Sequence, residues 1–524
     1  MSSAGIRSER LGALSDSVEE VLAELAGSRA VARLWERDHT LWAPDPTELS
    51  DRMGWLEVAK DLQAAAEEID GFVAGCLADG ITDDVVMGMS GSSLFPEVIA
   101  RSFAPPASGT GLTLSVLDST DPAAVAHIAG HLHPDTTLYL ASSKSGSTVE
   151  TRSHLEFFWE RIGRGDRFAV VTDPGSALGD LARDRGFCHV FENRADIGGR
   201  YSALSYFGLV PAALAGVDWA GMAGKAIAQE VSLRSEDPAV NVGLRLGAIL
   251  GAAVRQGRDK LTLLIDPSVS TFGLWLEQLL AESTGKHGTG VVPVADESLG
   301  PVDVYGDDRL FVSIGNAGHP IGLDVLAAAG HPVFELDLDE PLDLGAQVIV
   351  WEVATALCGA VLGINPFDQP NVAEAKEATN KVLADGAGAR PAATLAETLL
   401  TVKPGDYLAL QAYIDPNDDD VAQLQEIRME LRDELQVATT FGLGPRFLHS
   451  TGQLHKGGPP TGVFVQVVGD DVSDAEIPGQ EFTFSQLKHA QADGDLLTLD
   501  HHGLRACRTT LAELTRHVNQ GEAQ

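Results

Sequence analysis

Two similar stretches of sequence decide the fold, DVVMGMSGSS at residues 84–93 and TTLYLASSKSGST at residues 136–148. Each starts with a short apolar run typical of a buried strand and continues into a turn of glycine and small hydroxyl residues, ahead of a helical pattern. RFAVVTD (167–173) and CHVFE (188–192) are two further predicted strands. Strands separated by stretches long enough for crossover helices predict a parallel, doubly wound sheet.

A second series of strands begins near residue 240. The runs KLTLLID, RLFVSIG and HPVFELD, at residues 260–266, 309–315 and 331–337, predict another sheet of the same kind. Ahead of both series, residues 1–76 repeat apolar side chains at three- and four-residue steps, which is the period of an amphipathic helix. We therefore expect a helical segment followed by two α/β domains.

The sequence changes character after Lys381, where LADGAGARPAATL (383–395) is rich in Ala, Gly and Pro and predicts a boundary. Beyond it, the predicted strands are YLALQAYI (407–414), GVFVQVVG (462–469) and DLLTLD (495–500), with a helix in VAQLQEIRMELRDELQ (421–436). The predicted fold class is α/β, with two doubly wound parallel-sheet domains, an N-terminal helical segment and a C-terminal α/β extension. The predicted bounds are residues 1–76 for the helical segment, 77–230 and 231–385 for the two domains, and 386–524 for the extension.

The composition argues against several classes of function. The 524 residues include 75 Asp and Glu against 37 Lys and Arg, a formal net charge of −38, with a pI of about 4.6. Such a chain is poorly suited to neutralising nucleic-acid phosphates or to binding a membrane surface. No apolar run reaches the ~18 residues of a membrane span. The four cysteines form no CxxC pair and the N-terminus has no apolar signal core, so we expect a cytoplasmic protein.

The turns at residues 88–93 (GMSGSS) and 143–148 (SKSGST) are candidate phosphate sites. Unpaired backbone N–H groups at a helix N-terminus attract anions, and ligands of doubly wound sheets bind at the carboxyl ends of the strands. Neither turn is a Walker loop or a GxGxxG fingerprint. One such turn alone fits an ordinary helix cap equally well, and Ser147 with Glu150 matches a capping box. Two in one sheet favour a site for a small sugar phosphate.

Taken with later segments, these turns resemble the glucose-6-phosphate isomerase family. The later segments are GGRYS (198–202), ESTGK (282–286) and GINPFDQ (363–369), with Lys376 seven residues beyond. Five motifs in this order, spread over residues 88–376, make a specific match. The resemblance implies sugar-isomerase domains and the interconversion of glucose 6-phosphate and fructose 6-phosphate with neither metal nor cofactor.

The resemblance also implies roles for individual residues. Glu282 takes the place of the proton-transfer base, Arg200 that of the catalytic arginine and Lys376 that of an active-site lysine. Gly146 departs from the pattern, because a bulky residue is usual at that position. The residues implied to bind the substrate are Gly91, Ser92, Ser143, Lys144, Ser145, Ser147, Thr148 and Gln369.

The chain also departs from the family's ordinary pattern in its C-terminal part. The segment GPRFLHSTGQLHKGG (444–458) looks like the isomerase half of fused transaldolase/phosphoglucose isomerases. Because no room is left for a further barrel, we expect no transaldolase activity. The family's ring-opening histidine lies in a GxxGQHS-like loop. Here His319 in GNAGH and His455 in GQLH both have a partly similar context, and we favour His455.

Helical periodicity supports Glu282 as the base. Glu282 lies on the margin of an apolar helical stripe, whereas Glu277 falls near the opposite side. Partial burial raises the pKa of a carboxylate and can poise it as a base near neutral pH. A lysine placed like Lys376 more often snorkels than catalyses, but its spacing from Gln369 favours a function. The stripe consists of Phe272, Trp275, Leu276, Leu279 and Leu280.

The functional hypothesis is ring opening followed by proton transfer through a cis-enediol. The turns would hold the phosphate, His455 with Lys376 would open the ring, Glu282 would move the proton between C2 and C1, and Arg200 would stabilise the developing charge. Two alternatives stay open: an isomerase that also accepts mannose 6-phosphate, and a non-catalytic sugar-phosphate sensor. A homodimer is implied by the resemblance alone.

Overall fold

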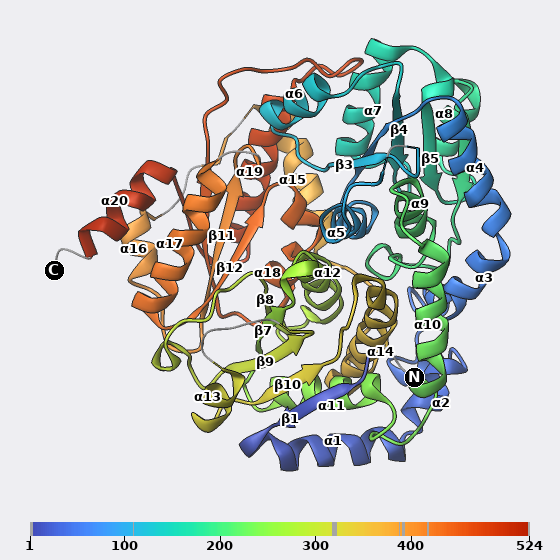
Figure 1. Cartoon of the computed structure of the whole chain (residues 1–524). Helices are drawn as coiled ribbons and strands as arrows, with labels where there is room; N and C mark the ends of the chain where they lie inside the picture. The colour runs from blue at the N-terminus through green and yellow to red at the C-terminus, as the bar shows by residue number, and fades with distance from the viewer. Residues whose placement is uncertain are drawn as a thin grey trace.

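The computed structural model describes residues 4–107, 109–316, 322–386, 388–389, 393–416 and 419–521. The described residues form three sheets, each flanked by helices (Figure 1). In Figure 1 the first sheet lies at the upper right, the second at the bottom and the third at the left, around a central group of helices. Part of the boundary predicted at residues 383–395 lies outside the described residues.

The first sheet has the strand order β3 (Thr113–Leu117), β2 (Asp83–Gly88), β4 (Thr137–Ser142), β5 (Phe168–Thr172) and β6 (His189–Glu192), all parallel. Val85, Val86 and Met87 are fully buried in β2, as expected of a strand covered on both faces. The strand order reverses between β2 and β4, so a crevice opens at their carboxyl ends. The accompanying helices are α5 (Leu94–Ser102), α6 (Pro122–His131), α7 (Val149–Ile162) and α8 (Ala177–Asp184).

The second sheet has the order β1 (Ile6–Arg10), β10 (Val333–Leu336), β9 (Arg309–Ile314), β7 (Lys260–Ile265) and β8 (Val292–Val294). The described pairs are parallel except that β1 runs antiparallel to β10. We predicted only helices for residues 1–76, and the strand β1 corrects this prediction. Its sequence IRSER has little strand character and is held by tertiary pairing, for example by Arg10, which donates to Glu335 over 2.6 Å. The helices of this segment are α1 (Ser15–Gly27), α2 (Ala30–Trp35), α3 (Val58–Ala64) and α4 (Ala66–Ala78).

The third sheet has the order β12 (Ala438–Leu443), β11 (Tyr407–Tyr413), β13 (Gly462–Val468) and β14 (Arg505–Thr509), again parallel. The strand predicted at residues 495–500 is wrong, because these residues end the helix α19 (Phe484–His501). Thr483 and Gln486 form the capping box that starts this helix. Leu497 and Asp500 are exposed while the two residues between them are buried, and this three-residue spacing is a helical pattern. The other helices of this C-terminal unit are α16 (Leu395–Leu399), α17 (Asp419–Leu435), α18 (Gly452–Gly457) and α20 (Leu511–Gly521).

Helices of the middle of the chain fill the space between the sheets. α14 (Leu344–Leu362) is the core of this layer. The stretch Pro341–Leu362 is long and apolar enough to cross a membrane, but 94% of its most apolar window is buried inside the protein, as in a core helix. The remaining helices are α9 (Tyr206–Leu214), α10 (Trp219–Leu233), α11 (Val242–Arg255), α12 (Phe272–Thr284), α13 (Leu323–Ala328) and α15 (Val372–Asp385).

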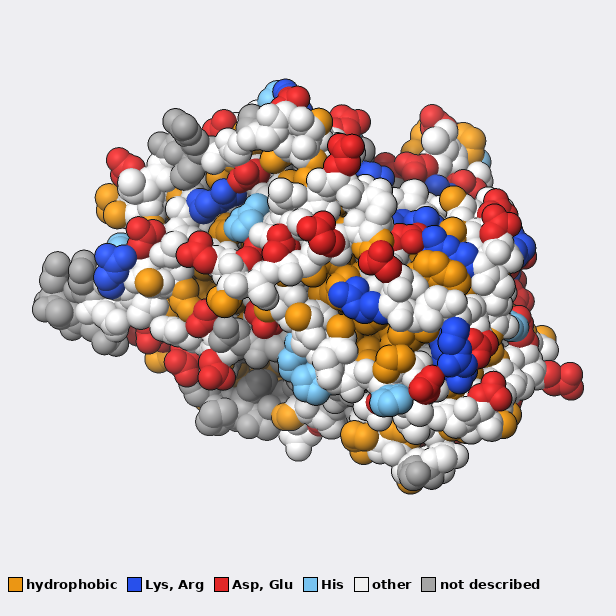
Figure 2. Space-filling view, turned by 90° about the horizontal axis from the view of Figure 1, so that it is seen from above, with side chains coloured by type: hydrophobic (Ala, Val, Ile, Leu, Met, Phe, Trp, Pro, Cys, Tyr) orange, Lys and Arg blue, Asp and Glu red, His pale blue; other side chains and the backbone are white. Residues whose placement is uncertain are grey.

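Buried ion pairs join the C-terminal unit to the carboxyl edge of the first sheet. Arg446 binds Asp118 through two hydrogen bonds of 2.8 Å, and Lys488 donates to Asp121 over 2.9 Å. Thr120 donates to Gln491 over 2.7 Å. On the face shown in Figure 2, Asp and Glu side chains are widely spread, while Lys and Arg form small separate groups. That face therefore carries no broad basic surface.

Candidate active site

A cavity of about 520 Å³ opens where the two predicted phosphate turns face α12, α15 and the short turn η10 (Arg446–His449). It lies at the carboxyl ends of β2 and β4, in the crevice where the strand order reverses. Glu282 and Lys376 line this cavity. So do all the residues implied to bind the substrate, namely Gly91, Ser92, Ser143, Lys144, Ser145, Ser147, Thr148 and Gln369.

The first turn packs tightly against the GGRYS segment. A Cβ atom on Gly91 would lie 1.8 Å from the carbonyl oxygen of Gly199, so only glycine fits there. Ser90 has a φ of 61°, an uncommon conformation for a residue with a side chain. Its hydroxyl accepts a hydrogen bond from Gln278 of α12. The turn is therefore fixed to the wall of the cavity before any ligand is bound.

The second turn is organised by its own hydroxyl groups. Ser143 Oγ accepts from the backbone N–H of Gly146 over 3.2 Å and lies 3.1 Å from Thr148 Oγ1. Gly146 has a φ of +69°, and an added Cβ would lie 2.6 Å from the backbone nitrogen of Leu178. These two constraints explain why glycine occupies this position.

The charge of Lys144 is shared with groups behind the turn. Its ammonium group pairs with Asp173 and donates to the carbonyl oxygen of Ala195 over 2.8 Å. Burial raises the pKa of Asp173, although the paired ammonium opposes the shift. The lysine consequently holds the turn in place while its side chain still lines the cavity.

The capping box predicted from Ser147 and Glu150 is wrong. Thr148 is the N-cap of α7, and no side-chain hydrogen bond caps the helix there. The carboxylate of Glu150 turns into the cavity instead, where it accepts hydrogen bonds from His449 over 2.9 Å and from Gln491 over 2.6 Å. Glu150 therefore bonds to residues that are distant in the sequence instead of capping its own helix.

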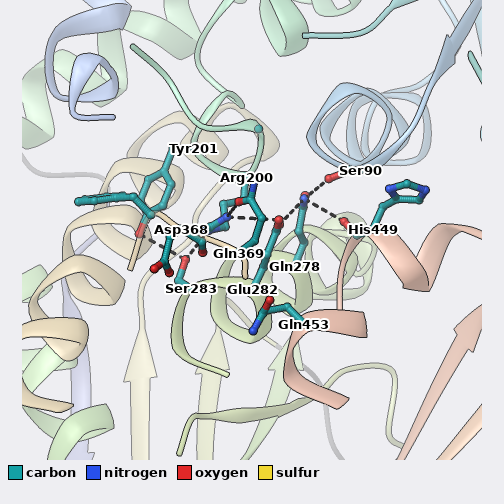
Figure 3. Close-up of polar contacts among 12 residues, drawn as sticks. Ser90, Arg200, Tyr201, Gln278, Glu282, Ser283, Asp368, Gln369, His449 and Gln453 are labelled. Carbon is teal, nitrogen blue, oxygen red and sulfur yellow. Dashed lines mark hydrogen bonds and ion pairs between the residues drawn. The ribbon is translucent and has the colours of Figure 1, made fainter. Parts of the chain in front are cut away.

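Both carboxylate oxygens of Glu282 contact side chains of the cavity wall (Figure 3). Oε2 accepts from Gln278 Nε2 over 3.0 Å, and Oε1 lies 3.3 Å from Arg200 Nη1. The side chain is 10% exposed, at the cavity wall. These contacts fix the carboxylate in one orientation.

Arg200 lies beneath the cavity rather than on its surface, with 1% of its side chain exposed. Its Nε donates to Ser283 over 2.8 Å, and Nη2 donates to two backbone carbonyls of residues 366–368. Nη1 donates to Gln369 Oε1 over 2.7 Å and also faces Glu282. Because the amide oxygen of Gln369 turns to the arginine, its NH₂ group is left for the cavity. Arg200 thus orients both Glu282 and Gln369.

Lys286 supports the same wall from further inside. Its ammonium group donates to the Asp368 carboxylate over 2.6 Å and to the carbonyl oxygen of Asn365 over 2.8 Å. Burial, reinforced by the charge of Arg200, lowers the pKa of Lys286 to about 8. The ESTGK motif therefore supplies the carboxylate that faces the cavity and the lysine that holds the loop carrying Gln369.

The apolar stripe predicted for α12 is buried, but the prediction for Glu277 is wrong. Glu277 is only 8% exposed, and Arg428 of the C-terminal unit is near enough for its charge to act on this carboxylate. Burial raises the pKa of Glu277 to about 8. The sequence pattern of one helix could not foresee a second layer packed on its other face.

His455, the predicted ring-opening residue, does not line the cavity. It is buried between the rings of Tyr407, Phe447 and Phe464, and Gln411 lies 3.2 Å from its Nδ1. Burial lowers its pKa to about 3, so the ring is neutral. The alternative, His319, lies outside the described residues.

The histidine at the cavity is His449, six residues before His455. It ends η10, and its Nε2 binds Glu150. Burial by itself would lower the pKa of His449, but the Glu150 carboxylate outweighs burial and raises it overall. Sequence reasoning passed over this histidine.

A family model described as phosphoglucose isomerase matches residues 28–308, slightly more than half of the chain. The chain belongs to the phosphoglucose isomerase family. The glucose-6-phosphate isomerase of Rubrobacter xylanophilus is 29% identical over 420 residues, which cover 68% of this chain and 95% of that protein. The glucose-6-phosphate isomerase of Nostoc punctiforme is 27% identical over 408 residues, which cover 68% of this chain and 76% of that protein.

Solved structures show the same fold as this member of the phosphoglucose isomerase family. A hypothetical protein from Thermus thermophilus superposes with a TM-score of 0.59 at 24% identity, covering 72% of this chain and 100% of that chain. The glucose-6-phosphate isomerase from Chlamydia trachomatis superposes with a TM-score of 0.55 at 20% identity, and the match covers 68% of this chain and 78% of that chain. The α/β fold class with two doubly wound domains is thereby confirmed.

Several cavity residues of this phosphoglucose isomerase family member were missed from the sequence. Gln278 carried a usable signal, because it precedes Glu282 by four residues and so shares its helix face. No sequence signal pointed to His449 or Gln491. Both lie beyond the family match and reach the cavity only through the packing of the C-terminal unit. Glu150 was interpreted as a helix cap.

Proposed function

We propose that this chain interconverts glucose 6-phosphate and fructose 6-phosphate. The observation that carries the proposal is one cavity in which the hydroxyl-rich turns face a carboxylate, Glu282, that is held by Gln278 and Arg200. The turns would bind the phosphate and fix the sugar, which makes proton transfer effectively unimolecular. Membership of the phosphoglucose isomerase family supports the same reaction.

Glu282 is the group that would carry the proton between C2 and C1. Abstraction at either carbon leaves a cis-enediol, and the developing negative charge on its oxygens needs donors. The NH₂ group of Gln369 and the ammonium group of Lys376 both line the cavity and can provide them. Arg200 acts from beneath, through its hold on Glu282 and Gln369. A pure sugar-phosphate sensor would need the turns but no carboxylate held in this way.

The test compares two carboxylates of the same helix. Glu282→Gln should lower kcat by about a thousandfold while fructose 6-phosphate still binds, because the shape and the phosphate site are retained. Glu277→Gln is the matched control, since Glu277 is equally buried on α12 but lies outside the cavity. It should keep kcat within about threefold of the wild type. Near-normal turnover by Glu282→Gln would rule out Glu282 as the base.

The C-terminal unit supports a finer assignment. Its segment at residues 444–458 resembles the isomerase half of fused transaldolase/phosphoglucose isomerases, and this segment includes the cavity residue His449. We assign the chain to that type. The cytoplasmic location and the homodimer stay predictions of the sequence and the resemblance.

A further inference from the structure

We propose that Asp173 holds the ammonium group of Lys144 in the free protein and takes up a proton when a sugar phosphate binds, which releases the ammonium group to the phosphate. Asp173 is then a positioning residue at the phosphate end of the cavity. The inference deepens the proposed function and rests on it, because it concerns the same phosphate turns. It implies that the affinity for the substrate depends on pH through a group that takes no part in the isomerisation itself.

Asp173 lies directly beside the second phosphate turn. It is the first residue after β5 and lines the cavity together with Ser143, Lys144 and Ser145. The backbone N–H of Asp173 donates to the carbonyl oxygen of Lys144 over 3.2 Å, and the hydroxyl of Thr172 donates to the carbonyl oxygen of Ser143 over 2.7 Å. These bonds tie the backbone of Asp173 to the turn, so its carboxylate stays near a phosphate that binds there.

The carboxylate of Asp173 depends on Lys144 for a partner of opposite charge. One of its oxygens, Oδ2, pairs with the ammonium group, which also donates to the carbonyl oxygen of Ala195 over 2.8 Å. The other oxygen, Oδ1, is buried and makes no hydrogen bond within the described part of the chain. Only 17% of the Asp173 side chain is exposed. Solvent therefore stabilises its negative charge poorly once the ammonium group has another partner.

A bound phosphate adds a second negative group to this pair. A phosphate monoester carries a charge close to −2 above about pH 7, because its second pKa is about 6. Lys144 is the only Lys or Arg in the sequence of the two turns, so the phosphate and the carboxylate compete for one ammonium group. Two acidic groups in one site cannot both keep their full charge at low cost.

The surroundings decide that the proton goes to Asp173 rather than to the phosphate. The phosphate meets the hydroxyl groups of the turn and the backbone N–H groups at the start of α7, where no side chain caps the helix. Such donors stabilise the dianion. Asp173 has no comparable set of donors, because Oδ1 is without a hydrogen bond among the described residues.

Burial and charge act on the pKa of Asp173 in the same direction once the phosphate is bound. In the free protein, burial raises this pKa, and the ammonium group of Lys144 opposes the rise. Two further charges face the carboxylate: Arg52 of the N-terminal segment lowers its pKa, and Asp196 of the loop before GGRYS raises it. Both are paired with other residues, so neither replaces Lys144 as the partner.

The consequence is a linkage between phosphate binding and proton uptake. The carboxylate of Asp173 becomes a carboxylic acid by taking one proton from the solvent, and no other covalent bond forms or breaks. Its pKa is higher in the complex than in the free protein. Between these two values, the dissociation constant of the sugar phosphate rises by up to about tenfold per pH unit, so binding weakens as the pH is raised.

The test counts protons with an anion that does not titrate. Inorganic sulfate remains a dianion near neutral pH, so any proton taken up belongs to the protein. Sulfate is mixed with the wild-type protein in weakly buffered solution at about pH 7.5, and a pH indicator records the protons. We expect an uptake of about 0.5–1 proton per sulfate bound. Glu282→Gln gives the same measurement with fructose 6-phosphate, because it binds the sugar without turning it over.

Three variants assign the proton to its residue. Asp173→Asn should take up less than about 0.1 proton, and the rise in its dissociation constant for fructose 6-phosphate between about pH 7 and pH 9 should be about tenfold smaller than in the wild type. Lys144→Met should bind both anions at least about tenfold more weakly, because the phosphate loses a charge-assisted hydrogen bond. Asp180→Asn removes an exposed carboxylate of α8 that is paired with Arg183, and should match the wild type.

The outcomes separate this inference from the proposed function. Sulfate binding without proton uptake, or equal uptake by the wild type and Asp173→Asn, would overturn the role of Asp173 and leave the isomerisation untouched. Undiminished binding by Lys144→Met would overturn it as well. If neither sulfate nor fructose 6-phosphate binds, the turns are no phosphate site, and the proposed function fails together with the inference. The first measurement uses the wild-type protein, so it does not depend on the folding of a variant.

Discussion

His449 and His455 lie six residues apart in the C-terminal unit, yet they have opposite environments. His449 faces a carboxylate at the edge of a cavity, and its pKa is raised by Glu150 in spite of burial. His455 is enclosed by three aromatic rings, and burial lowers its pKa to about 3.

The difference shows that a motif can indicate the right segment and the wrong residue. The GQLH sequence has the expected chemistry, but α18 turns its histidine towards the third sheet. The preceding turn, η10, faces the first sheet because Arg446 is anchored to Asp118. Which of the two histidines lines the cavity is therefore decided by the element against which each segment packs.

The largest effect on stability is expected from the anchor of the His449 region. Arg446→Met leaves Asp118, only 5% exposed, as an unpaired buried charge, so the free energy of unfolding should fall by about 3–5 kcal/mol. Denaturant unfolding followed by circular dichroism measures the loss. Adding Asp118→Asn should recover part of it, because the stranded charge is then removed. An unchanged midpoint in Arg446→Met would show that the pair does not hold η10 in place.

A smaller loss of stability is expected when His455 is replaced. His455→Gln removes a ring from the aromatic cluster and should lower the free energy of unfolding by about 2 kcal/mol. Since His455 lies outside the cavity, kcat should stay within about threefold of the wild type. Steady-state kinetics and thermal unfolding of the same preparation check both parts. A hundredfold loss of kcat in a folded variant would restore His455 as the catalytic histidine.

The smallest effect is the pH dependence of stability, which should have opposite signs at the two histidines. The lowered pKa of His455 means that the folded state resists protonation, so its contribution to stability is lost as the pH falls from about 6.5 to about 3. The raised pKa of His449 gives a contribution that is present below its unfolded pKa of 6.5 and is lost as the pH rises through its folded value. Each slope is at most about 1.4 kcal/mol per pH unit.

Thermal unfolding midpoints between pH 4 and pH 9 would resolve the two contributions. His455→Gln should lessen the loss of stability on acidification, while His449→Gln should lessen the loss on raising the pH from the neutral range. Shifts of the same sign in both variants would contradict the different environments described for the two rings.

Much of the fold followed from local pattern. The strands containing Val85 and Leu140 are buried apolar runs that end in glycine and serine turns, so their place in a parallel sheet was readable. The strand β1 was not, because IRSER acquires its pairing only from β10. The helix around Leu496 was misread because a short apolar run fits a strand and a helix equally well.

The candidate site divides in the same way. The turns that line the cavity and Glu282 could be predicted, because their residues are consecutive and their chemistry follows from the motif itself. His449, Gln491 and the turned carboxylate of Glu150 could not, because each depends on a contact across about 300 or more residues. Most strands, the hydroxyl-rich turns and the carboxylate at residue 282 could be recognised from local backbone preferences and hydrophobic periodicity. Which histidine lines the cavity depended on long-range packing, because buried ion pairs hold the C-terminal unit against the first sheet.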